Sequence, residues 1–217
     1  MLIREGLLRD VIDIILDKDR LNIPPLAKYP IAVQNDSGAQ SVNAVWSVLI
    51  SPKEEGDGFR AMKSKRDNKP YKTFNAKSTM LQKSPTWKPL FPSKRCIVPV
   101  SHFHEWAGKQ CYKIAPIEKP LAFGGLYKVW EFCGEIVHSF AIITLPGHSN
   151  LQHIHKQSVP LILEEKDFDM WLDPDFRQLD AFKNLLESHI PIDLKATPVD
   201  SPSKLNEIGE EEFITKD

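Results

Sequence analysis

The acidic residue best suited to chemistry in this 217-residue chain is Glu105, in the stretch from Arg95 to Trp106. It follows an apolar run and lies between Phe103 and Trp106, where we expect a strand to meet a turn at Ala107-Gly108. Apolar surroundings disfavour the charged form of a carboxyl, so its pKa should rise toward the range useful for proton transfer. The alternative is an exposed glutamate that pairs with a lysine.

Two histidines, His153 and His155, precede an apolar segment that ends at Leu163. On a strand they would point the same way, which allows metal ligation, but no third Cys or acid lies nearby at ligand spacing. We therefore expect no metal site and no cofactor. A single histidine acting as acid or base beside a carboxylate is the better functional interpretation, and structural histidines are the alternative.

A third polar candidate is Asn75, whose amide could bind a base edge or a sugar oxygen, or could cap a following helix. It lies in a basic segment that contains the single acid Asp67. A basic segment interleaved with aromatic residues suits a phosphate backbone with unstacked bases, and a solvated lysine loop is the alternative. The basic residues are Arg60, Lys63, Lys65, Arg66, Lys69, Lys72, Lys77, Lys83, Lys88, Lys94 and Arg95, and the aromatic ones Tyr71, Phe74 and Trp87.

The elements that must position these residues indicate an α+β class, with one domain over residues 1–217. We expect a mostly antiparallel, barrel-like sheet with flanking helices, because several short strands follow one another at regular spacing. Gly124-Gly125 and Cys133-Gly134-Glu135 are predicted turns or bulges, and 51–71 a long surface loop. The predicted helices are 7–16, 164–171 and 180–188, and the strands 31–33, 45–50, 96–100, 110–114, 121–126, 129–133 and 137–144.

Several fragments together resemble, in order, the blocks of the SOS-response-associated peptidase (SRAP) family, whose members process abasic sites. The resemblance runs over nearly the whole chain. Its blocks are Asn22-Ile23-Pro24-Pro25, Trp46 to Ile50, Asn75 to Thr79, Arg95 to Pro99 with His102 to Trp106, Ile154-His155 ahead of Val159 to Leu163, and Thr197 to Asp200 with Asn206.

The resemblance implies a mechanism in which a cysteine at position 2, exposed by methionine removal, captures the ring-opened aldehyde of an abasic site in single-stranded DNA. Asn75 would then orient the N-terminal group or the sugar, Glu105 would shuttle protons, and His155 would assist ring opening and reversal. The same residues would support autoproteolytic release of the N-terminal residue. Together with the basic segment, it leads us to expect DNA contacts at Arg4, Trp46, Lys72, Lys77 and Lys156.

The chain departs from the family pattern at position 2, where it has Leu2, so we expect Met1 to be retained. Lys77 replaces an arginine of the family, which reduces bidentate phosphate recognition to a point charge. The histidine block is one residue longer than the short family version and lacks its arginine, so His153 remains an alternative to His155. Without the thiol, the α-amino group of Met1 could still attack an aldehyde.

Our leading hypothesis is therefore a protein that binds and processes abasic sites in single-stranded DNA, with Schiff-base or lyase chemistry at Met1 in place of thiazolidine capture. A non-catalytic single-strand binder is the first alternative, and a hydrolase acting on another substrate the second. No apolar run is long enough to span a membrane and the three cysteines form no CxxC pair. We expect a cytoplasmic, DNA-associated monomer with reduced thiols.

Overall fold

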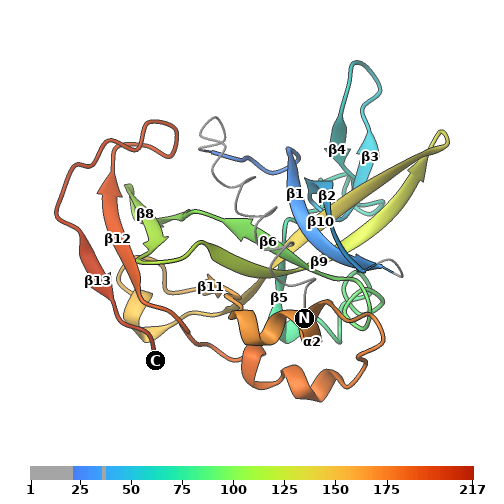
Figure 1. Ribbon diagram of the computed structural model, residues 1–217. Coiled ribbons are helices and arrows are strands. Elements are labelled where there is room, and N and C mark those ends of the chain that lie inside the picture. The colour runs from blue at the N-terminus through green and yellow to red at the C-terminus, as the bar shows by residue number, and fades with distance from the viewer. Residues whose placement is uncertain (1–21, 36–37) are drawn as a thin grey trace.

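Five strands close into a barrel at the centre of the fold (Figure 1). The computed structural model describes residues 22–35 and 38–217. The ring order is β2 (Gly38–Trp46), β1 (Lys28–Asn35), β6 (Arg95–Val100), β9 (Leu121–Phe132) and β10 (Glu135–Pro146), and β10 pairs with β2 again. The last pairing is parallel and the other four are antiparallel. The predicted α+β class and barrel-like sheet are confirmed, with one parallel seam.

Strand β10 extends the barrel beyond the ring. Its C-terminal half pairs on one side with β5 (Asn75–Lys77) and on the other with β11 (Ser158–Pro160). A second sheet has the order β13 (Glu212–Ile214), β12 (Leu194–Val199), β8 (Gln110–Pro116) and β7 (Phe103–Ala107). Because β7 follows β6 after two residues, the strand that carries Glu105 leads directly out of the barrel.

Helical structure in the described residues is short. The predicted helix at 164–171 is confirmed as the 3-10 turn η3 (Glu165–Asp167) and α2 (Phe168–Leu172), which begin with a capping box between Glu164 and Asp167. The helix expected at 180–188 is instead two 3-10 turns, η4 (Leu179–Phe182) and η5 (Asn184–Leu186). The remaining 3-10 turns are η1 (Ser78–Met80) and η2 (Ser149–Leu151). The helix predicted at 7–16 lies outside the described residues.

The structure corrects one loop, one turn and some strand predictions. The segment 51–71 contains a hairpin of β3 (Ile50–Pro52) and β4 (Phe59–Ala61), and the strand expected at 45–50 is divided between β2 and β3. Gly124 and Gly125 form no turn but lie inside β9, which also joins the strands expected at 121–126 and 129–133. A Cβ on Gly124 would lie 2.5 Å from Leu161, and one on Gly125 would lie 2.7 Å from the Ala141 carbonyl oxygen. These glycines therefore permit close strand approach.

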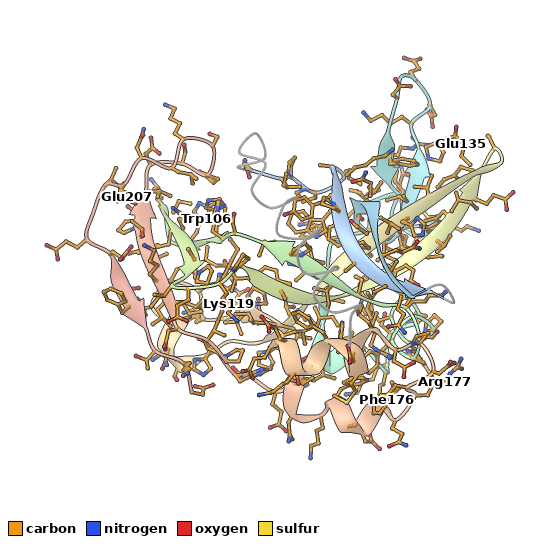
Figure 2. The ribbon with its side chains drawn as sticks, in the orientation of Figure 1. Trp106, Lys119, Glu135, Phe176, Arg177 and Glu207 are labelled. Atoms are coloured by element: carbon orange, nitrogen blue, oxygen red, sulfur yellow. The ribbon has the colours of Figure 1, made fainter. Side chains whose placement is uncertain are left out.

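The turn predicted at Cys133-Gly134 is confirmed at the tip of the β9–β10 hairpin. Phe132 pairs with Glu135, and the φ angles of Cys133 and Gly134 are 52° and 85°. Positive φ at both central residues is typical of the tight turns that suit twisted hairpins. Figure 2 shows Glu135 at this tip, projecting away from the barrel.

Arg95, at the start of β6, is buried and joins the barrel to the segment that follows β11. It is 2% exposed, and its guanidinium donates hydrogen bonds to five main-chain carbonyl oxygens, those of Phe91, Pro92, Trp171, Asp173 and Phe176. It also stacks over Phe182, 4.9 Å from the ring centroid. Burial lowers the pKa of Arg95 to about 10, which still leaves it charged at neutral pH. This arginine is therefore a structural centre and lies out of reach of a phosphate.

Replacing Arg95 with lysine should destabilise the fold by about 2–3 kcal/mol, because an ammonium has three donors for five carbonyl oxygens and each buried acceptor left unpaired costs roughly 1 kcal/mol. Urea unfolding followed by tryptophan fluorescence measures the change. The matched control is Lys88→Arg on the exposed surface, which should change the free energy of unfolding by less than about 0.5 kcal/mol. Equal midpoints for the two variants would contradict this role for Arg95.

Candidate functional site

Glu105 and His155 form a polar pair between two distant parts of the chain. Glu105 lies in the middle of β7, and His155 lies in the loop between β10 and β11. Nδ1 of His155 is 3.1 Å from Oε2 of Glu105, and the two side chains are 29% and 22% exposed. A proton can move directly between the two groups at that distance, while each remains accessible to a substrate.

Burial raises the pKa of the Glu105 carboxyl to about 7. The sequence prediction of a raised pKa is therefore supported, but the surroundings differ from those expected. Side chains alternate along a strand, so Glu105 shares its face of β7 with Phe103, while Trp106 projects to the other face and is 47% exposed. Phe103 packs edge-on against Phe123, with ring centroids 5.5 Å apart. The apolar barrel end thus contributes to desolvation, and the ring of Trp106 does not cover the acid.

Two other histidines close to Glu105 in sequence are poor proton donors. Burial, His104 and Lys113 lower the pKa of His102 to about 4. Burial and Lys113 also lower the pKa of His104. These rings lie 5.0 Å apart, and His102 is neutral at physiological pH. His155 is therefore the histidine available to Glu105.

The loop 147–157, here called the histidine loop, holds the two candidate histidines apart. It contains no strand, so the geometry in which His153 and His155 would point the same way is absent. His153 instead pairs with Glu212, its Nε2 lying 2.6 Å from Oε1. Buried Leu151 and Ile154 fix the loop to the core. Among residues 22–35 and 38–217, no three His, Cys, Asp or Glu side chains form a cluster that could hold a metal ion.

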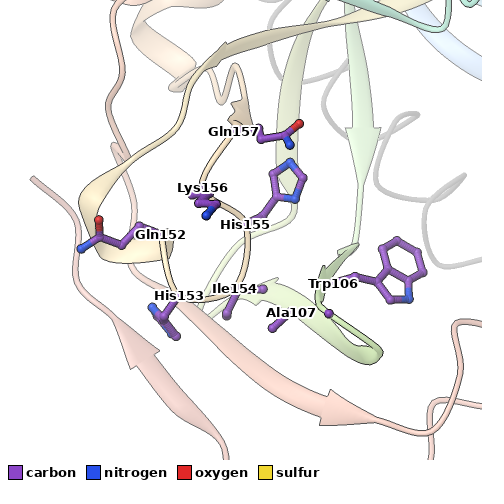
Figure 3. Close-up of a pocket in the computed structure, with 9 residues that line it drawn as sticks. Trp106, Ala107, Gln152, His153, Ile154, His155, Lys156 and Gln157 are labelled. Atoms are coloured by element: carbon purple, nitrogen blue, oxygen red, sulfur yellow. The ribbon is translucent and has the colours of Figure 1, made fainter.

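A cavity of about 350 Å³ lies between the histidine loop and the β7–β8 turn. Its lining includes Gly108, His153, His155 and Lys156. In Figure 3, His155 lies in the middle of this region, while the ring of Trp106 points away from the loop. The space beside the Glu105–His155 pair can therefore admit part of a polar ligand.

Asn75 and Lys77 lie on β5, and they share its exposed face because Ala76 between them is buried. No hydrogen bond joins either side chain to Glu105 or His155 in the described structure. Both residues pair across to β10, Asn75 opposite Ile142 and Lys77 opposite Thr144. Asn75 is in a strand and does not cap η1, whose N-cap is Lys77.

The aromatic residues of the basic segment and its neighbourhood are mostly packed inside. Trp46 donates its Nε1 hydrogen to the Phe74 carbonyl oxygen at 2.8 Å and stacks on Phe140. Trp87 is 7% exposed, whereas Tyr71 is 42% exposed. Lys72 and Lys156 are exposed. The described surface therefore offers lysines and Tyr71 to a nucleic acid, rather than a row of stacking rings. Met1 and Arg4 lie outside the described residues.

Sequence reasoning missed the acids that hold the histidine loop, because their connection to it is purely tertiary. Glu212 contacts His153, and Asp217 contacts His148, with His148 Nε2 lying 3.0 Å from Asp217 Oδ1. The acidic character of the C-terminal segment was the one available signal. It could not indicate which acids face the loop.

The family model for SOS response associated peptidases (SRAP) matches residues 13–204 of the chain. The chain belongs to the SRAP family. The match includes Asn75, Glu105 and His155 and ends before β13. The resemblance seen in the ordered sequence blocks is thereby confirmed.

Relatives and solved structures agree with this assignment. The abasic site processing protein YobE of Bacillus subtilis is 30% identical over 138 residues, which cover 60% of this chain and 63% of YobE. The abasic site processing protein YMR114C of Saccharomyces cerevisiae is 35% identical over 114 residues, covering 49% of this chain and 30% of that protein. Alignments thus span less than two thirds of these relatives.

The fold is similar to that of two solved structures. A protein from Bacteroides thetaiotaomicron has a TM-score of 0.61 and 24% identity, with 82% of this chain and 79% of that chain covered. A phage-related protein from Bordetella bronchiseptica has a TM-score of 0.61 and 22% identity, with 88% and 90% covered. Among the described residues no helix is long and apolar enough to cross a membrane.

The Glu105→Gln variant should gain stability relative to the unmodified protein as the pH rises from 5 to 8. The Glu105 pKa is raised from 4.5 to about 7 in the folded state, so the unfolded chain releases this proton first. The free energy of unfolding of the unmodified protein therefore falls by about 2–3 kcal/mol between pH 5 and 8. The Glu105→Gln variant lacks this titrating group and does not show that fall. Urea unfolding of both proteins at several pH values measures the difference. A difference that is constant with pH would contradict the raised pKa.

Proposed function

We propose that this protein processes abasic sites in single-stranded DNA, with Glu105 and His155 as its proton-transfer pair. The observation that carries the proposal is their 3.1 Å contact together with the Glu105 pKa of about 7. A carboxyl that titrates near neutral pH can both donate and accept a proton at physiological pH. The names of the curated SRAP relatives, which are abasic site processing proteins, support the choice of substrate.

An abasic site supplies an aldehyde when its sugar ring opens, and the proposed reaction begins with an amine. The neutral α-amino nitrogen of Met1 attacks the C1′ carbon, and one of its two protons passes to the carbonyl oxygen, which becomes a hydroxyl. Glu105 in its protonated form gives a proton to that hydroxyl, which leaves as water, and a protonated imine links protein and DNA. The imine nitrogen then releases its remaining proton, which passes through His155 to restore the Glu105 carboxyl. His155 also assists ring opening of the sugar.

The imine can react in two ways. Water can add to it and restore the amine and the aldehyde. Alternatively, a base removes a proton from C2′ and the C3′–O bond breaks, which cleaves the strand on the 3′ side. Leu2 carries no thiol that could close a thiazolidine on the imine, so we propose a transient link rather than a durable one.

Positive charge on the described surface supports single-stranded DNA as the ligand. Lys72 and Lys77 are exposed and form no ion pair with any described residue. Lys77 lies on the same face of β5 as Asn75, where we propose that the amide orients the sugar. Lysines that form no ion pair with the described residues can displace the counterions of a phosphate backbone.

Single-stranded oligonucleotides test the proposal directly. With borohydride present, an oligonucleotide that carries an abasic site should give a covalent adduct, and one with an intact base should not. Glu105→Gln should slow trapping by about 100-fold, the scale of lost acid–base catalysis. Glu131→Gln, at an exposed position of β9, is the matched control and should react like the unmodified protein.

The main alternative is a single-strand binder that keeps the fold without chemistry. It predicts equal, salt-sensitive binding of both oligonucleotides and no trapped adduct. Acetylation of the α-amino group further distinguishes the catalytic protein from a protein that only binds DNA. If trapping survives acetylation unchanged, the Met1 amine is not the nucleophile; if no adduct forms in any condition, the catalytic proposal fails.

A further inference from the structure

The histidine loop is held at both ends by the C-terminal strand and the residues after it. His148 near its start contacts Asp217, with 3.0 Å between Nε2 and Oδ1. His153 contacts Glu212, with 2.6 Å between Nε2 and Oε1. Between them, the Asn150 side-chain amide donates to the Thr215 carbonyl oxygen at 3.0 Å. Three separate polar contacts thus join the loop to residues 212–217.

These C-terminal residues are themselves fixed, so they can act as a template for the loop. Ile214 is 3% exposed and pairs with Leu194 of β12. Asp217 accepts a hydrogen bond from the Ile190 amide at 3.0 Å and donates its own amide hydrogen to the Ile190 carbonyl oxygen at 3.0 Å. The Lys216 amide donates to Asp193. The loop is therefore docked on a surface that strand β12 and the chain before it hold in place.

The hydrogen-bond pattern of His148 fixes its tautomer. Its Nδ1 accepts a hydrogen bond from the Asn150 amide at 3.2 Å, so the ring hydrogen lies on Nε2 and is donated to Asp217. The ring is 9% exposed. In this arrangement the ring accepts one hydrogen bond and donates another, and the two bonds together hold the first turn of the loop.

The second half of the loop restricts the position of His155. Glu212 holds His153, which is two residues from His155, and the buried Ile154 lies between them. A Cβ on Gly147 would lie 2.1 Å from the Lys156 carbonyl oxygen, so the two ends of the loop touch. Displacement of one end must therefore move the other, and His155 with it.

We propose that Glu212 and Asp217 are positioning residues, which hold the histidine loop so that His155 stays on Glu105. Neither acid touches the Glu105–His155 pair, and both act through His153 and His148. The inference deepens the proposed function, since the positioned pair is the one assigned there to proton transfer. Its first test reads the geometry of the pair and needs no DNA.

The first test is a coupling measurement by NMR of the histidine rings. In the unmodified protein, Glu105→Gln should shift the ring resonances of His155. In Glu212→Ala and Asp217→Ala, made singly and together, the same substitution should shift them by less than half as much. Glu212→Gln keeps an acceptor oxygen for His153 and should restore the shift. A merely structural role would lower stability without changing this coupling.

Two further variants bracket the effect. Glu210→Ala removes an exposed charge two positions before Glu212 that forms no hydrogen bond or ion pair with the described loop residues, so it should leave the coupling unchanged. Gly147→Ala displaces the loop by direct overlap and should abolish it. If the double alanine variant retains the full coupling, the positioning role is refuted.

Borohydride trapping on an abasic oligonucleotide provides the second readout. The double variant should lower the single-turnover rate by about tenfold or more, because a small misplacement of a catalytic group is costly. The DNA concentration for half-maximal rate should stay unchanged. An unchanged rate would also overturn the positioning role. If the unmodified protein forms no adduct, the proposed function fails, and the NMR coupling still decides this inference.

Discussion

The burial of one guanidinium organises the part of the fold that supports the site. Arg95 stands at the first residue of β6, and its five carbonyl partners come from the turn before β6 and from the end of α2 and the chain after it. A buried charge is tolerable only when hydrogen bonds replace its hydration, and here the main chain provides all of them. The consequence is that β6 and α2 cannot move independently. Strand β7, which carries Glu105, therefore starts from a fixed point.

The same competition between burial and hydration acts at Glu105 in the opposite direction. Arg95 is surrounded by carbonyl oxygens, which stabilise its charge, whereas Glu105 has His155 as its one described polar partner. Burial lowers the Arg95 pKa from 12.5 to about 10, opposed by the charge of Asp173, and raises the Glu105 pKa from 4.5 to about 7. One group stays ionised and structural, and the other titrates where proton transfer is useful. The two shifts are similar in size, so the groups differ at neutral pH because the ordinary pKa values of a guanidinium and a carboxyl lie far apart.

Local patterns in the sequence indicated the strands, the class and Glu105 itself. Alternation and composition located β6, β8 and β10, and apolar neighbours marked Glu105 as a group with a raised pKa. Sequence could not distinguish a glycine that turns the chain from one that admits a neighbour, as at Gly124, because the neighbour Leu161 is 37 positions away. It also counted Arg95 and Trp87 with the DNA-facing residues, although both are buried. Charge and aromaticity are local properties, while exposure is set by the whole fold.

The histidines show this limit most clearly. His153 and His155 lie on either side of Ile154 with a polar residue beyond each, and only tertiary contacts assign them to different acids. His153 pairs with Glu212, 59 positions later, and His155 pairs with Glu105, 50 positions earlier. A loop without regular structure needs such contacts to hold a side chain in place, since its own backbone supplies few hydrogen bonds. The acid that titrates and the acids that hold the loop thus make one arrangement, in which distant carboxylates fix the position of a single imidazole.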